Sequence, residues 1–185
     1  MASIDISARV IGDKELSAAL ARMSSHDIPK AVSAGVRLAA RGGRTTLAKE
    51  VGQRYSLTAS RIKQDVSQPQ FSNGGQTAIL RTNRKPITAM QFKPRQTRQG
   101  LSMAIFRGER TVVKSGFIAK GLPFRRQGKA RLPIDTIKGP SIHAIYTGGK
   151  HAQPIQEATK TRIEEQLVKG IEQRISAMGR GFAKG

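Results

Sequence analysis

The order of elements along the chain predicts an α+β fold. The N-terminal residues alternate in hydropathy with a period of two, two later segments carry apolar residues at helical spacing, and several short strand-like runs lie between those segments. We therefore expect an N-terminal strand and long amphipathic helices, then a central antiparallel sheet with long basic loops, then a C-terminal helix. The length suits a single domain over residues 1–185.

The first strand is predicted over residues 3–10, where apolar and polar side chains alternate as in a half-buried strand. Gly12 and Asp13 end it, and Asp13 is placed to cap a short helix. The apolar side chains that share one face of this helix are Leu16, Leu20 and Met23.

A long amphipathic helix is predicted to start at Asp27 and to reach about Tyr55, because Pro29 suits a first helical turn. Gly42 and Gly43 interrupt this helix, so we expect either a kink or the close approach of another backbone. The apolar stripe of the helix is Val32, Val36, Ala40, Leu47 and Val51.

A helical corner is predicted after this helix, with Thr58 as the cap of a further short helix. The outline also suits a helix-turn-helix in which Ser60, Arg61 and Lys63 face bases. The ordinary corner is favoured, because helix-turn-helix domains are mostly helical and the following segment is strand-like.

Four strands are predicted in the middle of the chain, with Gly108–Glu109 as a hairpin turn between the last two. Their ranges are 77–82, 86–92, 101–107 and 110–119. The two longest connections, residues 93–100 and 120–131, are polar and strongly basic, so we expect exposed and mobile loops.

A last helix is predicted to open at Pro154 and to end in a frayed tail at residues 180–185. Acidic residues gather in its first half and arginines come late, as the helix dipole prefers. Its apolar stripe is Ile163, Leu167, Ile171, Ile175 and Met178.

The overall composition is strongly basic, with 33 Lys and Arg against 12 Asp and Glu, a net charge of +21. The chain has no cysteine, which excludes disulfides, thiolate metal sites and cysteine nucleophiles. No secretory signal and no membrane-spanning apolar run is evident, so we expect a soluble protein made in the cytoplasm.

The positive charge is concentrated in residues 81–138, which hold 15 basic and 2 acidic residues, net +13. Such a segment suits either phosphate backbones, bound without reading sequence, or the acidic surfaces of protein partners. Both interpretations stay open. The residues expected to contact a partner or a DNA backbone are Arg81, Arg84, Lys85, Lys93, Arg95, Arg98, Lys120, Arg125, Arg126, Lys129 and Arg131.

Catalysis is not expected. Ser141, His143 and Asp135 could be written as a triad, but three residues so close in sequence rarely converge, and no nucleophile elbow frames the serine. Histidines and carboxylates lack metal-ligand spacing, and no glycine-rich segment matches a phosphate-binding loop. We predict a non-enzyme without catalytic residues, metal or cofactor.

The segment 131–142, RLPIDTIKGPSI, is interpreted as a structural bend that fixes the basic loops and the C-terminal helix. Its proline and glycine residues stop a short strand from extending and force a turn. Ile134 and Ile137 are expected near the core, and Asp135 is expected to hold a backbone or arginine partner. The residues assigned to the bend are Pro133, Asp135, Gly139 and Pro140.

The chain resembles the minor tail protein Z family, the tail completion proteins of bacteriophages with long non-contractile tails. The resemblance covers residues 3–180: a strand and a long arginine-bearing helix, the corner RYSLTASRIKQDV, and the stretch 131–142 leading to a final helix. That stretch is similar to the family's arginine-aromatic-Pro-Ile-Asp followed by Lys-x-Pro, with Leu132 in place of the aromatic residue.

This resemblance implies a structural protein at the head-proximal end of the tail, made in the host cytoplasm and then part of the virion. Its implied partners are the tail terminator, the head connector, further copies of itself in a sixfold ring, and the end of the packaged double-stranded DNA. No membrane partner and no cofactor are implied. The alternatives are a free nucleic-acid-binding protein, which the charge also explains, and a hydrolase built on the Ser141 group.

Overall fold

A computed structural model of the chain describes residues 2–7 and 26–182, with side chains described for residues 26–178. It has the expected α+β composition, with helices and antiparallel strands. The chain divides into two compact units, residues 1–47, 66–82 and 156–185 in the first and residues 48–65 and 83–155 in the second. The single domain over residues 1–185 stays a prediction.

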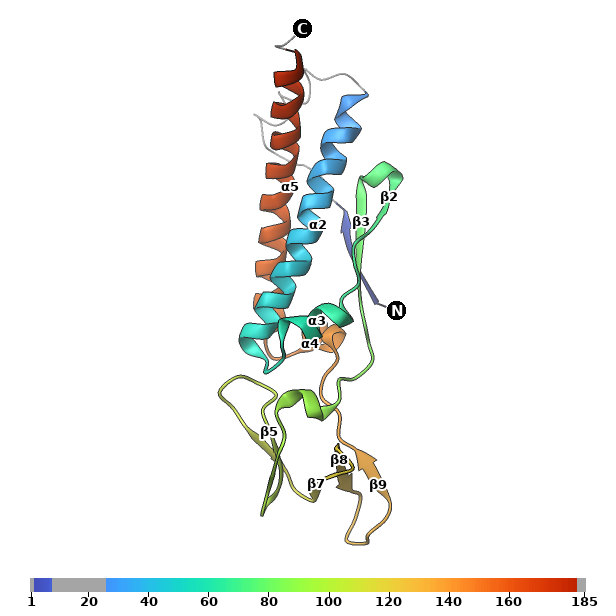
Figure 1. Cartoon of the computed structure of the whole chain (residues 1–185), viewed down its shortest axis with the longest axis vertical. Helices are drawn as coiled ribbons and strands as arrows, with labels where there is room; N and C mark the ends of the chain where they lie inside the picture. Colours follow the sequence, from blue (N-terminus) through green and yellow to red (C-terminus); the bar gives the residue numbers. More distant parts are fainter. Residues whose placement is uncertain (1, 8–25, 183–185) are drawn as a thin grey trace. The chain divides into compact units, whose positions relative to one another are not determined.

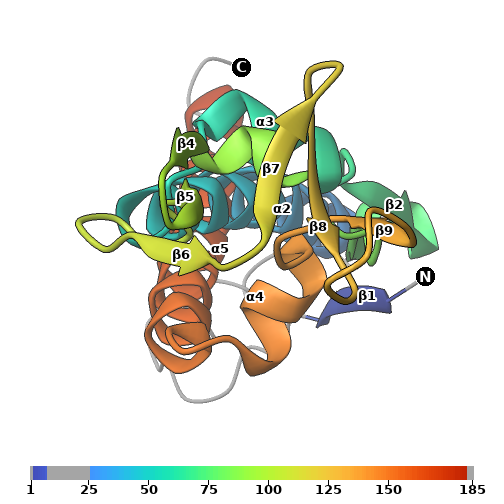
Figure 2. The ribbon, with the colours of Figure 1, turned by 90° about the horizontal axis from the view of Figure 1, so that it is seen from below.

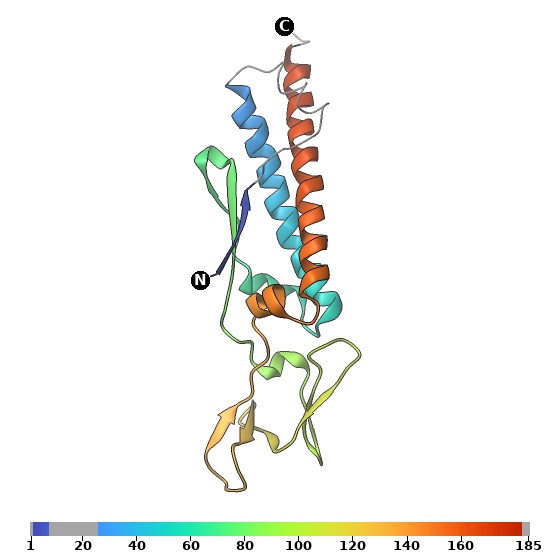
Figure 3. The same cartoon turned by 180° about the vertical axis from the view of Figure 1, so that it is seen from behind.

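Two long helices form the centre of the first unit. Helix α2 (Asp27–Arg54) and helix α5 (Ala152–Phe182) run side by side within this unit (Figures 1 and 3). Val32, Ile163 and Ile175 pack against the edge of the core between them. The buried residues of that core are Ala31, Val36, Ala39, Ala40, Ala78, Leu167 and Ile171.

The glycines predicted to interrupt the long helix, Gly42 and Gly43, do not end it, because α2 continues to Arg54 as one element. Gly42 faces the side chain of Gln166, not another backbone. The close backbone approach occurs earlier in α2, where the main chain of Gly35 lies against Gly170 of α5. The sequence pattern therefore predicted glycine-dependent packing on the right helix but at the wrong glycine.

The sheet of the first unit joins the N-terminal strand to a later hairpin. Strand β1 (Ala2–Ser7) pairs with β3 (Thr77–Thr82) in antiparallel register, and β2 (Gln70–Ser72) pairs with the other edge of β3. A 3₁₀ turn, η1 (Asn73–Gly75), connects β2 to β3. The predicted strands are thus confirmed over residues 3–7 and 77–82.

The buried residues of the second unit include Tyr55, Ile62 and Ile145. Helix α3 (Ala59–Asp65) begins as predicted after Thr58, whose Oγ1 accepts a hydrogen bond from the Arg61 N–H at 3.2 Å. Helix α4 (Ile142–Gly148) was not predicted from the sequence.

Two small antiparallel sheets complete the second unit (Figure 2). Each is a meander of three short strands rather than part of the one central sheet that the sequence predicted. The first has the order β4–β5–β6 and the second β7–β8–β9. Their bounds are β4 Arg95–Thr97, β5 Gly100–Met103, β6 Thr111–Val113, β7 Gly116–Ala119, β8 Leu122–Arg126 and β9 Ile134–Thr136.

Several predicted strand bounds were wrong. Residues 86–92 contain a 3₁₀ helix, η2 (Ala89–Phe92), whose Ala89 and Phe92 are buried three positions apart. The run 101–107 ends as a strand at Met103, and the run 110–119 is split at Ser115, which has φ 62°. Gly108–Glu109 lies within the longer connection 104–110 between β5 and β6.

The two segments predicted as irregular loops each contain a strand. Residues 93–100 include β4 and residues 120–131 include β8, both of which pair with neighbouring strands. Gln96 also joins the two sheets, because its Oε1 accepts from the Ile118 N–H at 3.2 Å and its Nε2 donates to the Gly116 carbonyl at 3.4 Å. Both segments remain rich in exposed side chains.

The C-terminal helix begins at Ala152, two residues before the predicted Pro154. Of its predicted stripe, Leu167 and Ile171 are buried and Met178 is half-buried. The tail predicted as frayed over residues 180–185 is helical as far as Phe182, where α5 ends. Residues 183–185 lie outside the described residues, as do the end of the first predicted strand at residues 8–10 and the short helix with Leu16, Leu20 and Met23.

Candidate functional site

The second unit carries most of the protein's charge, with 19 basic and 4 acidic residues, net +15. All four of its carboxylates have partners within the unit. Glu50 pairs with Arg54, Glu109 with Lys150 at 3.3 Å, and Asp135 accepts from the Gln127 side-chain amide at 2.8 Å. The fourth, Asp65, lies in a small polar network.

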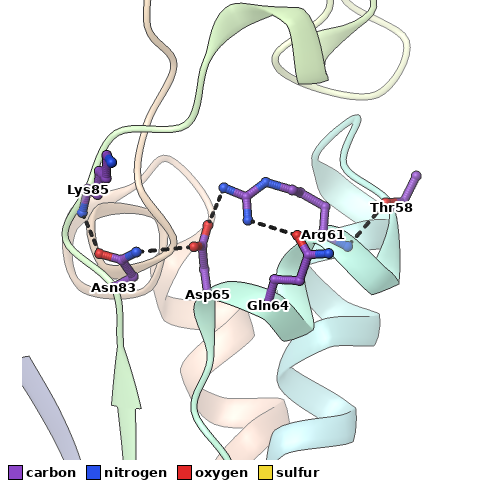
Figure 4. A network of polar contacts seen from close by, with 6 residues as sticks. All are labelled: Thr58, Arg61, Gln64, Asp65, Asn83 and Lys85. Atoms are coloured by element: carbon purple, nitrogen blue, oxygen red, sulfur yellow. Dashed lines mark hydrogen bonds and ion pairs between the residues drawn. The ribbon is translucent and has the colours of Figure 1, made fainter.

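That network ties α3 to the segment after β3 (Figure 4). The buried Asp65 carboxylate pairs with the Arg61 guanidinium at 2.9 Å between Oδ2 and Nη2, and accepts from the Asn83 side-chain amide at 3.3 Å. Asn83 in turn accepts from the Lys85 backbone N–H. Arg61 is therefore occupied inside the protein, which argues against the alternative in which it faces bases.

The basic residues of 81–138 stand outside these pairs. None of the ion pairs between described residues uses any of the 15 basic side chains in this segment. The available carboxylates are taken by Arg54, Arg61 and Lys150, from outside the segment, and by Gln127. The positive charge of the segment is consequently left without a counter-charge in the part of the chain that the structure describes.

The predicted contact residues are all exposed, but they do not form one group. Arg81 lies on β3 in the first unit, whereas the others belong to the second. Three follow η2 along the hairpin of β4, namely Lys93, Arg95 and Arg98. Five lie on β8 or in the connections at its two ends, and they are Lys120, Arg125, Arg126, Lys129 and Arg131. The remaining pair, Arg84 and Lys85, precedes η2.

A groove of about 760 Å³ lies within the second unit. Its apolar lining includes Ala48, Gly52 and Leu57, and the connection 104–110 closes another side. The sequence predicted Lys93 as a contact residue, but it did not predict that Lys93 lines a groove together with other cations. The cationic lining residues are Lys49, Lys93, Arg107 and Arg110.

Arg110 is held in a defined position in this groove. Its Nε donates to Ser102 Oγ at 2.9 Å, and its Nη2 donates to the carbonyls of Ser102 and Lys93 at 3.0 and 2.9 Å. These bonds fix the guanidinium against β5, so its charge stays at the groove wall.

The predicted short strand is present as β9 (Ile134–Thr136), and the Leu132–Pro133 peptide bond before it is cis. The turn predicted at Gly139–Pro140 is absent, because neither residue lies in a turn or bend. The Gly139 N–H donates to the Ile87 carbonyl at 2.7 Å, and a side chain on Gly139 would overlap the Phe92 ring. Pro140 then leads into the cap of α4.

The two isoleucines of the bend differ in burial. Ile137 is buried as expected, but Ile134 is 37% exposed because it lies on the opposite face of the short strand. Asp135 has an amide partner, Gln127, instead of the expected backbone or arginine partner.

Two residues of the triad written from the sequence, Ser141 and Asp135, have other hydrogen-bond partners. Ser141 Oγ accepts from the Ala144 N–H at 3.1 Å and caps α4, while Asp135 is bonded to Gln127.

No group of His, Cys, Asp and Glu suited to a metal ion occurs among the described residues. No helix in the described part of the chain is long and apolar enough to cross a membrane.

Comparison with known proteins agrees with the family resemblance. A family model described as prophage minor tail protein Z (GPZ) matches residues 12–179. No curated protein and no solved structure gives a significant match. Since the family model covers most of the chain, the protein belongs to the prophage minor tail protein Z family, a structural family with no known enzymatic activity, and is a component of the phage virion tail.

Proposed function

We propose that this tail protein completes the head-proximal end of the tail as a ring, where it joins the tail terminator and the head connector and contacts the end of the packaged DNA. A sixfold ring follows from the symmetry of the tails that the family resemblance implies. A ring of identical subunits would surround the channel with a repeated set of basic side chains.

The observation that carries this proposal is the unneutralised charge of the second unit. Its four carboxylates are engaged internally, and its net charge is +15. Charge of this size favours association with a polyanion or with acidic protein surfaces, and it favours a dispersed, monomeric state without them. A joint between tail and DNA-filled head provides both kinds of partner.

DNA contact is assigned to the hairpin of β4 and the groove beside it. Lys93, Arg95 and Arg98 are exposed on this hairpin, and Arg107 and Arg110 extend the same charge along the groove. Contacts of this kind bind phosphates without reading bases, as a protein that meets any packaged DNA end requires.

A free nucleic-acid-binding protein would explain the same charge. Membership in a tail family favours a role in the virion instead, with DNA as one partner among several.

The position is tested by immunogold electron microscopy of an induced lysate, with antibody against this protein. Label at the head-proximal end of tails is expected. Label at the distal tip, along the shaft or on free nucleic acid would overturn the proposal. Native mass spectrometry of the complex released from purified tails measures the ring, for which six copies are expected.

DNA contact is tested by titrating a short duplex against the protein at several salt concentrations. Replacing Lys93, Arg95 and Arg98 together by Gln should reduce the slope of log K against log salt by about 0.9 for each lost phosphate contact. The matched control removes the same charge from α5 through Lys160→Gln, Arg162→Gln and Lys169→Gln. Equal slopes in the two triple variants would contradict the assignment.

A further inference from the structure

The sheet β7–β8–β9 has one face that is only partly buried within the second unit. Its register sets Phe117 opposite Phe124, Ala119 opposite Leu122, and Arg126 opposite Ile134. Because side chains alternate along a strand, all six of these residues share one face of the sheet. Gly116, Pro123 and the following Ile137 are buried on the other side.

This face is apolar at its centre. Leu122 is 46% exposed and Ile134 is 37% exposed, while Phe117 and Phe124 are half-buried with their ring centroids 6.0 Å apart. Leu132, two residues before β9 begins, is 65% exposed. Apolar side chains gathered in this way on a soluble surface typically mark a contact with another molecule.

Positive charge borders the same face. The Arg126 guanidinium lies 5.6 Å from the centre of the Phe117 ring, Lys120 lies in the turn at one end of the sheet, and Lys129 and Arg131 lie in the connection at the other end. The one carboxylate on these strands, Asp135, lies on the opposite face and is bonded to Gln127. The face therefore combines aromatic rings at its centre with an arginine and further cations at its borders, a composition typical of protein interfaces.

We infer that this face is the docking surface for a different protein of the tail, one that presents an apolar patch bordered by acidic side chains. The inference deepens the proposed function, on which it rests, by assigning β7–β8–β9 to protein and leaving the β4 hairpin to DNA. Leu122 and Ile134 make no favourable contact with phosphates, so duplex DNA would leave the apolar centre unused. The same face of a second copy is an unsuitable occupant, because a twofold pairing would bring its cations together.

The test uses tails purified from a phage in which this gene is deleted. Purified protein is mixed with these tails, and the fraction that sediments with them gives an apparent Kd. The double variant Leu122→Ser, Ile134→Thr should bind at least about tenfold more weakly than wild type, which corresponds to the loss of a small interface hot spot. Val112→Ser is the matched control, because Val112 is 40% exposed on β6 of the neighbouring sheet, and it should bind as wild type does.

The acidic character of the partner is tested separately. Lys129→Gln together with Arg131→Gln should weaken binding to tails and reduce its dependence on salt, because rim charges act through long-range attraction. Circular dichroism and thermal unfolding check that each variant is folded, which is expected because every changed side chain is exposed.

Wild-type binding to tails with undiminished binding by the double variant would overturn the docking face alone, whereas no wild-type binding would overturn the proposed function as well. Loss of affinity for single- or double-stranded DNA in the double variant would make the face a nucleic-acid surface and overturn the inference. So would a change in self-association by sedimentation velocity, since the occupant would then be a second copy.

Discussion

The Cα atom of Gly35 in α2 lies 2.7 Å from the position that a Cβ atom on Gly170 of α5 would take. The main chains of the two long helices therefore meet directly at this point. A Cβ on Gly35 would similarly meet the Leu167 carbonyl oxygen at 2.7 Å. Neither backbone can move aside without separating the helices along their packed core.

Gly170→Ala is expected to destabilise the protein even though alanine is the better helix former. The gain in helix propensity is up to about 1 kcal/mol, whereas overpacking against a backbone typically costs about 1–3 kcal/mol. Urea unfolding followed by circular dichroism measures the difference. Gly148→Ala, at the end of α4 with open space around it, is the control and should be neutral or slightly stabilising.

Asp65→Ala should lower the free energy of unfolding by up to about 3 kcal/mol. It removes a buried partner of Arg61 and leaves the Asn83 amide without its acceptor, but Arg61 keeps some access to water. Glu109→Ala breaks the exposed pair with Lys150 and should cost at most about 1 kcal/mol. Similar losses in the two variants would contradict the importance of burial at Asp65.

Alkaline pH should destabilise the fold through its two tyrosines. Burial raises the pKa of Tyr55 and of Tyr146 above the ordinary value, so the folded state holds these phenol protons more tightly than the unfolded state. The resulting stability is fully present below about pH 10 and is lost as the pH rises from there through the folded-state pKa values.

The pH effect is measured as the free energy of unfolding at increasing pH above neutrality. Tyr146→Phe should show a shallower alkaline decline than wild type, and Tyr55→Phe with Tyr146→Phe a shallower one still. Titration of lysines is common to all the proteins compared, so it cancels in the differences. Parallel pH curves would exclude a tyrosine contribution.

Arg110→Lys should lower the free energy of unfolding by about 1–2 kcal/mol although the charge is kept. An ammonium group cannot reproduce the three guanidinium bonds to Ser102 and to the Lys93 carbonyl. Chemical denaturation measures the loss. Arg98→Lys, in the exposed turn after β4, should leave stability unchanged, and an equal effect at both positions would count against the anchoring role.

The long helices and β3 could be predicted because their apolar residues repeat over many positions. The core positions Val36, Leu47 and Ile171 follow directly from that period. The short strands of the second unit could not, since β4, β6 and β9 contain only three residues each and carry no clear alternation. Pairing between strands stabilises them, and pairing is not encoded in any one segment.

By itself, the sequence determined the class of protein. Its charge pattern and the stretch 131–142 indicated a structural tail protein without catalytic machinery, and those features depend only on which residues are present and in what order.

The tertiary structure decided which charges are neutralised and which faces are only partly buried. Asp65 and Arg61 neutralise one another inside the second unit, and the register of β7 and β8 gathers Phe117, Phe124 and Leu122 on one face. Both outcomes depend on distances between side chains in folded strands and helices, and the linear order of residues does not specify those distances.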